Sequence, residues 1–411
     1  MLRRAFWFGS MFCLLAVPAL SQDASSGFSL PVTLSGGGMY SERLEVRDPS
    51  ESPFTGGMRV MLYPTLKLGE HWFGYAAIQE TLAPYFYYDA YNPEHEWLTN
   101  VIQAFAGYSW RTEKVSMMVK AGRLSSAFGS FPLRYDDAAN PLLDQPLSYI
   151  QSLTLRSNQI PCGVSDLLSQ PYGSVSHFCG GVTGRQRGLT PVTLYGLPGI
   201  EADISGGRLD ARLQITDGSP ADPLGLSHVD QYVQWTAGAG YTIQQGFRVG
   251  ISGFRGPYLD PSLAPLLAAG TTARDFPANA LGVDAQWARG RWSAGGEWQH
   301  FRFDSPNFVV SPSINSTYGE VKTVLTPRLF LAGRAGWLSP GGAVDKKGIS
   351  TAQFAPSIAS YELGAGVWLN HYQLLKASYE WLDIEHQTGS RFNVLGVQLV
   401  TTFHMPDWSF R

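Results

Sequence analysis

The stretch that decides the fold reads Leu209-Asp210-Ala211-Arg212-Leu213-Gln214-Ile215-Thr216 and follows a Gly206-Gly207 turn. Apolar residues occupy every second position, and polar residues fill the positions between them. Successive side chains of a β-strand point to opposite faces of the sheet, so this strand would have one apolar and one polar face. The stretches 115–121, 281–288 and 328–337 alternate in the same way. The chain is therefore predicted to be all-β.

The connections between such stretches alternate in length along the chain. Short turns such as Gly69-Glu70, Gln245-Gly246 and Arg289-Gly290 alternate with longer polar connections that are rich in proline and glycine. Seven short and eight long connections predict sixteen antiparallel strands, with both chain ends on the short-turn side. A barrel through the bacterial outer membrane has this asymmetry, because its short turns face the periplasm and its long loops face outward. The apolar strand faces would then contact lipid, and the polar faces would line water.

Each expected strand has at least the roughly nine to eleven residues that a tilted membrane strand needs. The strands are predicted at 29–42, 54–68, 71–88, 98–111, 114–123, 191–205, 208–217, 229–243, 246–256, 279–288, 291–303, 314–325, 328–338, 360–369, 372–384 and 391–404. They are expected to close into a transmembrane antiparallel β-barrel, because an open sheet edge in lipid would leave backbone groups unpaired. Sixteen strands enclose a lumen wide enough to hold water.

Composition and the N-terminal segment narrow the class of protein further. Only 15% of the residues are charged, and no run of eighteen apolar residues after the N-terminus predicts a membrane-spanning helix. The formal net charge of −3 is too small to suggest a nucleic-acid partner. Residues 1–21 predict a signal peptide, because Arg3-Arg4 precede an apolar core and a cleavage site after Ser21. The barrel is expected over 22–404, and a periplasmic C-terminal tail over 405–411.

Two cysteines, Cys162 and Cys179, lie in the longest connection, 124–190. An exported loop passes through an oxidising compartment, so a disulfide between them is expected, with a stabilisation of about 3 kcal/mol. The alternative is a metal site that uses both cysteines and His177, although two Cys and one His make a poor zinc ligand set. No cofactor is expected.

The segment Lys120-Ala121-Gly122-Arg123-Leu124-Ser125-Ser126-Ala127-Phe128-Gly129 resembles a motif of the phosphate-selective porin O and P family. In that family a strand ends in a glycine-basic-hydrophobic run and then enters a long loop near Phe-Gly. The closing strands from Tyr361 to Phe403 also look similar, and Phe403 resembles the final aromatic residue that the barrel-assembly machinery recognises. The resemblance implies a channel for small hydrophilic solutes or ions in outer-membrane lipid, often a homotrimer. It is not specific for phosphate.

The predicted lumen departs from that family, which clusters lysines and arginines, because it carries charges of both signs. Opposed rows of both signs would set a transverse field but little preference between anions and cations. The alternative is that these charges only pair with one another and stabilise the wall. The wall residues proposed to line the pore are Arg212, Glu297, Glu320, Lys322, Arg328 and Arg334.

The long third connection is the second candidate for pore-lining residues, because loops of this length inside compact folds are usually functional. In porin-like barrels a long third external loop folds toward the lumen and narrows it, and the resemblance implies the same here. The expected constriction charges of the loop are Arg134, Asp136, Asp137, Asp144, Arg185 and Arg187. The alternative is an external lid over neighbouring loops or a neighbouring protomer.

Sequence signals of an enzyme are absent. There is neither a Gly-x-Ser-x-Gly nucleophile turn nor a His-Glu-x-x-His pair. His300 with Ser293 or Ser305 is the only pair to nominate for an outer-membrane hydrolase. The preferred hypothesis is therefore a non-enzymatic porin for passive diffusion. Its rivals are a plugged structural or adhesion-type barrel without channel activity, and an outer-membrane enzyme.

Overall fold

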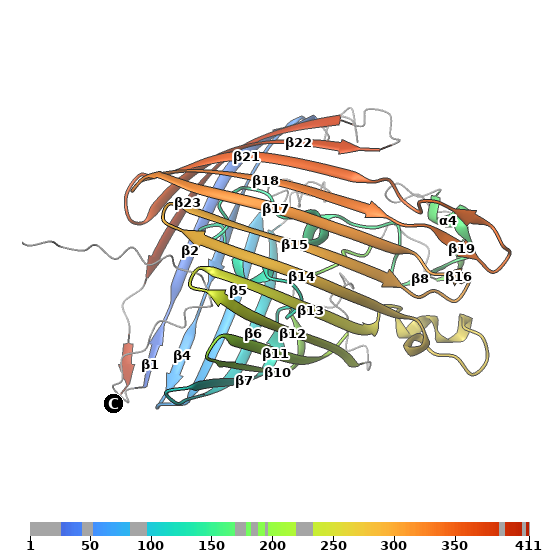
Figure 1. Cartoon of the computed structure of the whole chain (residues 1–411), viewed down its shortest axis with the longest axis horizontal. Coiled ribbons are helices and arrows are strands. Elements are labelled where there is room, and N and C mark those ends of the chain that lie inside the picture. Colours follow the sequence, from blue (N-terminus) through green and yellow to red (C-terminus); the bar gives the residue numbers. More distant parts are fainter. Residues whose placement is uncertain are drawn as a thin grey trace, which may run out of the picture.

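The computed structural model describes residues 26–42, 52–82, 97–168, 178–181, 188–193, 196–218, 233–385, 391–404 and 408–410. Within these ranges nineteen strand segments form one antiparallel sheet that closes on itself. Three short segments, β1 (Ser26–Ser29), β4 (Thr65–Leu68) and β24 (Trp408–Phe410), continue β2, β3 and β23. The sheet is therefore a closed barrel of sixteen antiparallel strands, as Figure 1 shows from the side.

The strands follow one another round the barrel in chain order, and the pairing of β2 with β23 closes it. Their bounds are β2 Pro31–Ser41, β3 Phe54–Leu62, β5 Trp72–Leu82, β6 Trp97–Arg111, β7 Val115–Leu124, β10 Leu197–Gly206, β11 Leu209–Asp217, β12 Val233–Gln244, β13 Phe247–Pro257, β14 Pro277–Arg289, β15 Trp292–Phe303, β17 Ser313–Thr326, β18 Leu329–Pro340, β21 Ile358–Trp368, β22 Gln373–Ile384 and β23 Arg391–His404. The sixteen-strand prediction is confirmed.

The two rims of the barrel differ in the way that the alternating connections predict. Short turns join the strands at one end, on the left in Figure 1, and the longer connections gather at the other end. The short turns contain Gly207 (φ +60°) and Gly290 (φ +62°), which adopt the left-handed conformation that a tight hairpin requires. We call these ends the short-turn rim and the long-loop rim.

At the short-turn rim, the closing pair of strands β2 and β23 is extended by the short strands β1 and β24. β1 pairs with both β4 and β24, and Gly27 lies opposite Ser409. The segment 405–411, predicted to be a tail, thus includes three residues that lengthen the closing strand. The visible C-terminal end lies beside β1 in Figure 1. The predicted signal peptide, 1–21, lies outside the described residues.

Outward and inward faces of the strands carry opposite polarity. On β14, Leu281 and Val283 are exposed on the outside, whereas Asp284 is buried on the inside. A broad outward band of exposed Leu, Ile, Val, Trp and Tyr side chains follows the same rule. This inversion of a soluble protein's pattern is what lipid around the barrel and water within it require.

The two largest differences from the predicted strands in the described chain are at β3–β4 and at β10. The predicted strand 54–68 divides into β3 and β4 at Tyr63-Pro64, because proline lacks the N–H that the ladder needs. The predicted strand 191–205 begins only at Leu197, since residues 188–193 belong to the preceding loop.

Smaller elements occupy the long third connection and the long-loop rim. They are η1 (Phe131–Arg134), α3 (Leu147–Ile150), β8 (Gln159–Pro161), α4 (Val164–Leu168), β9 (Phe178–Gly181), η2 (Pro261–Leu266), η3 (Ala273–Asp275), β16 (Phe308–Val310), β19 (Ala343–Asp345) and β20 (Ser350–Thr351). None of the helices in the described ranges has the length and apolar character to cross a bilayer.

Candidate functional site

The third loop leaves the barrel wall at the end of β7, within the segment 120–129 that resembles the porin motif. Gly122 near the end of β7 has φ +142°, and a Cβ there would lie 2.4 Å from the Ala104 carbonyl oxygen of β6. Only glycine tolerates this close approach of two strands. The motif glycine therefore allows β7 to pack tightly on β6 just before the chain turns inward.

Phe128 and Gly129 bring the loop onto the opposite part of the wall. The Phe128 ring is fully buried against Phe254 of β13 and Phe301 of β15, with ring centroids 5.2 and 5.6 Å away. Gly129 has φ +75°, and a Cβ there would lie 2.2 Å from Tyr149 Oη and 2.7 Å from Glu297 Oε2. The Phe-Gly step thus combines a buried apolar contact with a backbone approach that no other residue would allow.

The carboxylate of Glu297, on the inner face of β15, receives the loop directly after this step. Its hydrogen-bond donors are Ser130 N and Oγ, Phe131 N, Tyr149 Oη, Tyr318 Oη and Gln299 Nε2, at 2.6 to 3.0 Å. A buried carboxylate needs such donors to offset its desolvation. Glu297 therefore fixes the position of η1 and α3 against the wall.

Arg334 of β18 forms a second attachment. Its guanidinium binds Glu320 of β17 at 2.7 Å and Glu362 of β21 at 3.4 Å. The same guanidinium donates to the Asp144 carbonyl and the Asn140 side chain of the loop. Arg134, from η1, also pairs with Glu320. One buried network of both signs thus joins three strands to the loop.

The loop is attached to β3 and β22 by a third set of contacts. Asp137 forms a buried ion pair with Arg59 of β3, and Asp136 accepts a hydrogen bond from Tyr63. Lys376 of β22 donates to the carbonyl oxygens of Asp137, Asn140 and Leu142, at 2.8, 3.1 and 3.1 Å. Burial alone would raise the pKa of Asp137, but Arg59 and Lys376 outweigh it and hold that pKa below its ordinary value.

Asp144 behaves in the opposite way to Asp137. Its pKa is raised well above the ordinary value of 3.8, first by burial and then by the carboxylates of Glu380 and Glu362. Three acidic groups thus share one buried part of the interface between loop and wall. The protonated form of Asp144 is favoured there, because it lowers the repulsion among them.

Taken in order round the barrel, these contacts lie on β15, β17, β18, β21, β22 and β3. Apolar loop residues, among them Phe131, Leu147 and Ile150, form a buried cluster with wall residues such as Ile314 and Leu338. The described part of the loop therefore lies mainly against this part of the inner wall, and its first residues also contact β11 and β13.

The inner wall from β7 to β14 carries its own ion pairs. Lys120 of β7 lies opposite Glu201 of β10 and pairs with it at 2.6 Å. Arg248 of β13 binds Asp210 of β11 through two nitrogens, at 2.6 and 2.9 Å, and reaches Asp284 of β14 at 3.0 Å. Lys120 and Glu201 sit on neighbouring strands, as do Arg248 and Asp284, whereas Arg248 reaches Asp210 across β12, so the charges pair along the wall as well as facing the lumen.

Water reaches part of this wall, although Lys120, Glu201 and Asp284 there are buried, and Arg134 of the loop is 28% exposed. The side chains of Asp210, Asp203 and Arg248 are 39%, 27% and 23% exposed. Those of Arg59 and Asp137, beneath the loop, are 1% and 4% exposed. Gly240 makes room for the partly exposed Arg248 side chain, because a Cβ on Gly240 would lie 2.0 Å from the Arg248 guanidinium. We call the inward charged surface of β7 to β14 the wet wall.

The structure brings together most, but not all, of the residues predicted to line the pore. Arg134, Asp136, Asp137, Asp144, Glu297, Glu320 and Arg334 lie in the attachment contacts. Arg212 belongs to the wet wall and donates to the Gly129 carbonyl of the loop at 3.1 Å. The ammonium of Lys322 lies 4.2 Å from the centre of the Phe330 ring.

Three predicted residues are not brought to either group. Arg328 is exposed in the turn between β17 and β18, at the short-turn rim, because its strand begins one residue later. Arg185 and Arg187 lie outside the described residues. The disulfide between Cys162 and Cys179 stays a prediction; Pro161 lies opposite Phe178, which puts both cysteines at the same end of the β8–β9 hairpin.

Several residues of the site were not singled out from the sequence. Glu201 and Asp203 of β10 alternate with the outward residues Ile200 and Ile204, so alternation within the predicted strand could have identified them. Tyr149 and Tyr318 gave no signal, because buried phenol groups show no sequence pattern. Within the described ranges no group of three or more His, Cys, Asp and Glu side chains has a metal-binding arrangement, and His177 lies outside those ranges.

Comparison with known proteins gives a likeness in fold only. No protein-family model and no curated protein matches the chain. Among solved structures, the anion-selective porin from Comamonas acidovorans superposes with a TM-score of 0.56 and 11% identity, over 92% of this chain and 100% of that one. The chain has the porin fold. OmpT, an outer membrane protein of Vibrio cholerae, superposes with a TM-score of 0.55 and 10% identity, over 93% of this chain and 99% of that one. The trimer form of OmpT superposes with a TM-score of 0.52 and 9% identity, over 92% of this chain and 100% of that one.

The porin fold places the chain in the outer membrane of a Gram-negative bacterium, because a closed barrel with an outward apolar band needs lipid around it. The porin part of the sequence resemblance is thus supported. The phosphate-selective subtype stays a prediction.

Proposed function

We propose that this protein is an outer-membrane porin through which small hydrophilic solutes and ions diffuse passively, without cofactor or covalent chemistry. The path runs between the third loop and the wet wall. The observation that carries the proposal is that the side chains of Asp210, Asp203 and Arg248, on the inner face of the wet wall, are partly exposed. The Arg59–Asp137 ion pair between the loop and the wall is buried by comparison.

The charges along this path favour weak ion selectivity. Lys120, Arg212 and Arg248 lie beside four acidic residues of the same surface, Glu201, Asp203, Asp210 and Asp284. Opposite signs at close range set a local field but leave little net charge. A general or sugar-type porin fits this surface better than a phosphate channel, which would need a cluster of unpaired cations.

Assembly as a homotrimer belongs to the same proposal. It is supported by the likeness in fold to the trimer form of OmpT. Analytical ultracentrifugation of the refolded barrel in detergent tests this part, and a monomer at all concentrations would contradict it.

The experiment that tests the proposal is single-channel recording from the refolded mature chain in a planar bilayer. We expect steady ohmic steps, with a small reversal potential in a salt gradient. A strongly anion-selective reversal potential would revive the phosphate-type hypothesis. Silence, with a correctly folded barrel, would contradict the proposal and favour the plugged structural barrel.

A further inference from the structure

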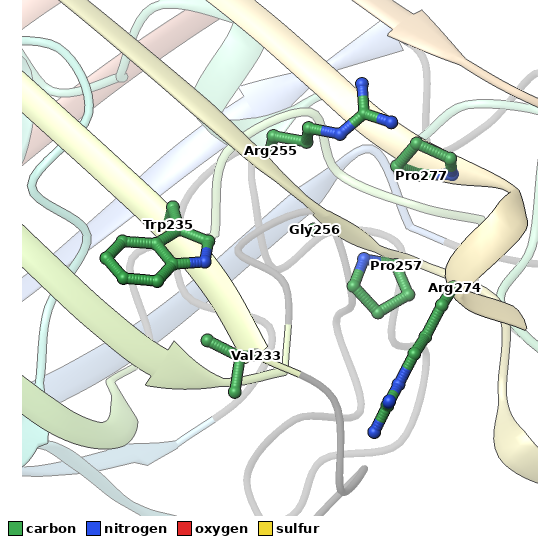
Figure 2. Close-up of a pocket in the computed structure, with 7 residues that line it drawn as sticks. All are labelled: Val233, Trp235, Arg255, Gly256, Pro257, Arg274 and Pro277. Carbon is green, nitrogen blue, oxygen red and sulfur yellow. The ribbon is translucent and has the colours of Figure 1, made fainter.

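A pocket of about 300 Å³ on the outside of the barrel does not meet a solute that diffuses through the lumen. Its described lining comes from the ends of β12, β13 and β14 and from η3, as Figure 2 shows. Trp235 and Arg255 in this lining are direct strand partners, and both occupy outward positions. A binding site for the solute itself therefore has to lie on the inner wall.

Aromatic side chains interrupt the inner face of the wall between β3 and β7, where such a barrel is otherwise polar. Trp72, at the start of β5, points outward and is 58% exposed, so Phe73 and Tyr75 have inward positions. Tyr75 lies directly opposite Phe105 of β6. We call the inward aromatic group the aromatic strip; its members are Tyr63, Phe73, Tyr75 and Phe105.

The rings of the aromatic strip contact one another in sequence across the wall. The Tyr63 and Tyr75 ring centroids are 6.4 Å apart, with their planes only 21° from parallel. The Phe105 ring lies 5.4 Å from Tyr75 and 6.1 Å from Phe73. Both phenylalanines are buried, whereas both tyrosines are only partly buried. The phenylalanines therefore support the strip, and the tyrosines form its accessible surface.

Charged groups border the aromatic strip at both ends. At one end, the Tyr63 phenol donates a hydrogen bond to Asp136 of the third loop, which also shows that Tyr63 points inward. At the other end, the ammonium of Lys120 lies 5.7 Å from the centre of the Phe105 ring. Lys120 pairs there with the partly exposed carboxylate of Asp203, at 2.7 Å. The strip thus runs from the third loop to the edge of the wet wall.

The phenol of Tyr75, between these ends, is available to a ligand. No described residue forms a hydrogen bond with it, although its ring contacts Tyr63 and Phe105. A phenol combines an apolar ring with a hydroxyl group that needs a hydrogen-bond partner. The strip therefore offers both an apolar face and a polar group to a solute.

The charges around the strip favour a neutral solute. Protein cations already lie over the rings at its two ends, because Lys120 faces Phe105 and Arg59 lies 4.8 Å from the centre of the Tyr135 ring in the loop. These cations oppose the binding of an organic cation to the rings. The carboxylates of Asp136 and Asp203 oppose the approach of an anion. Groups of both signs nevertheless form strong hydrogen bonds with uncharged hydroxyl groups.

We propose that the aromatic strip binds a neutral sugar, such as a short oligosaccharide, during its diffusion through the lumen. The C–H face of a sugar ring packs on the rings of Tyr63 and Tyr75, and sugar hydroxyl groups bind the Tyr75 phenol and the charged groups at the two ends. The sugar site rests on the proposed porin function, because the solute reaches the strip through the lumen.

The test is isothermal titration calorimetry of the refolded barrel with maltotriose, in a detergent without a sugar headgroup. The variants are Tyr75→Leu, which removes the ring, and Tyr75→Phe, which keeps the ring and removes the phenol oxygen. The matched control is Tyr241→Leu, because Tyr241 points outward on β12 and is 43% exposed. Heat-modifiable electrophoretic mobility verifies that each barrel is folded. Calorimetry does not require conduction, so the sugar site and the porin function can fail separately.

We expect Tyr75→Leu to bind maltotriose about threefold to tenfold more weakly than the parent. Tyr75→Phe should lie between the two, and Tyr241→Leu should bind as the parent does. Equal binding by Tyr75→Leu and Tyr241→Leu would overturn the proposal, and so would a Tyr75→Phe variant that binds as weakly as Tyr75→Leu.

The class of solute is tested in the same experiment with choline and benzoate. Tighter binding of either than of maltotriose would show a site for an organic cation or an aromatic anion and would overturn the proposal. Absence of maltotriose binding by a barrel that conducts ions steadily in a planar bilayer would contradict the sugar site alone. Maltotriose binding by a barrel that stays silent there would contradict the porin function alone.

Discussion

At the scale of single residues, Phe128 and Gly129 determine how the third loop meets the wall. Phe128 supplies buried area between two strands, and Gly129 allows the backbone to approach Glu297 and Tyr149. Sequence reasoning found this pair only as part of a motif. The structure gives the physical reason for it, because a side chain at 129 would occupy the space of a phenol oxygen.

Gly129→Ala is expected to displace the start of the loop. A non-glycine residue at φ +75° costs about 1–3 kcal/mol in backbone strain, and its Cβ would collide with Tyr149. Thermal unfolding should occur at lower temperature, and single-channel conductance should rise or become noisy. Gly319→Ala is the control, because a Cβ there meets nothing within 4 Å. Equal behaviour of the two variants would contradict this role for Gly129.

Asp144 gives the loop a pH dependence whose sign follows from its raised pKa. The folded state favours the protonated carboxyl, so this part of the stability is complete below the unfolded pKa and is lost as pH rises through the folded value. The loop should therefore be held more firmly in acid, where Asp144 is protonated, than at a pH above its raised pKa. Asp137, whose pKa is lowered, stays ionised until the acid is stronger, and only there does its ion pair with Arg59 lose stability.

Asp144→Asn tests this dependence, because the amide imitates the protonated carboxyl. The variant should show similar open-channel noise below and above the raised pKa of Asp144, whereas the parent becomes quieter as the pH falls. Noise that changes with pH equally in both proteins would mean that other groups hold the proton. Glu362 and Glu380, which surround Asp144, would then be the next candidates.

At the scale of elements, the third loop lies mainly against the wall from β15 round to β3, and the wet wall lies from β7 to β14. Both parts of the wall contain paired charges. Arg59, Arg334 and Lys376 are buried and bind the loop, so they stabilise its position. Asp210 and Arg248 are partly exposed, and we propose that they meet the diffusing solute. The sequence left pairing and pore lining as alternatives for these charges, and the pore-lining role stays a prediction.

Arg248→Gln should shift ion selectivity toward cations. It removes the only described partner cation that bridges Asp210 and Asp284, and so adds negative charge to the wet wall. The reversal potential in a salt gradient should move in the cation direction, with little change in stability, because partly exposed ion pairs contribute roughly 0–1 kcal/mol. Arg289→Gln, at the short-turn rim, is the control. An unchanged reversal potential would mean that solutes pass elsewhere.

At the scale of the whole molecule, closure of the barrel depends on pairing between the two ends of the chain. Eleven register pairs join β2 to β23, and three more join β1 to β24. The Phe28 and Trp408 rings lie 5.6 Å apart across the short extension. This extension continues past His404, where the sequence predicts the closing strand to end.

Truncation after His404 should leave a folded barrel with a lower unfolding temperature. The main seam remains, while the β1–β24 pairs and an aromatic contact of about 0.5–1.5 kcal/mol are lost. Heat-modifiable mobility on electrophoresis measures the transition, and removal of Arg411 alone is the control. An unchanged transition would show that the extension contributes nothing, and failure to insert would show that assembly requires it.

The sequence by itself determined the class, the strand number and the two different rims of this protein. These follow from local rules, since alternation fixes which face of a strand meets lipid, and turn residues fix where each hairpin reverses. Arg212, Glu297, Glu320 and Arg334 were found for the same reason, because inward positions on a strand are set by a period of two.

Only the tertiary structure decided what those inward residues touch. Glu297 and Tyr149 are 148 positions apart, and Lys376 and Asp137 are 239 apart, so no local pattern relates them. The loop's path depends on which wall residues can satisfy its backbone groups, and that requires the closed barrel. Arg328 was misplaced because a boundary error of one residue moves a side chain from the lumen to the rim.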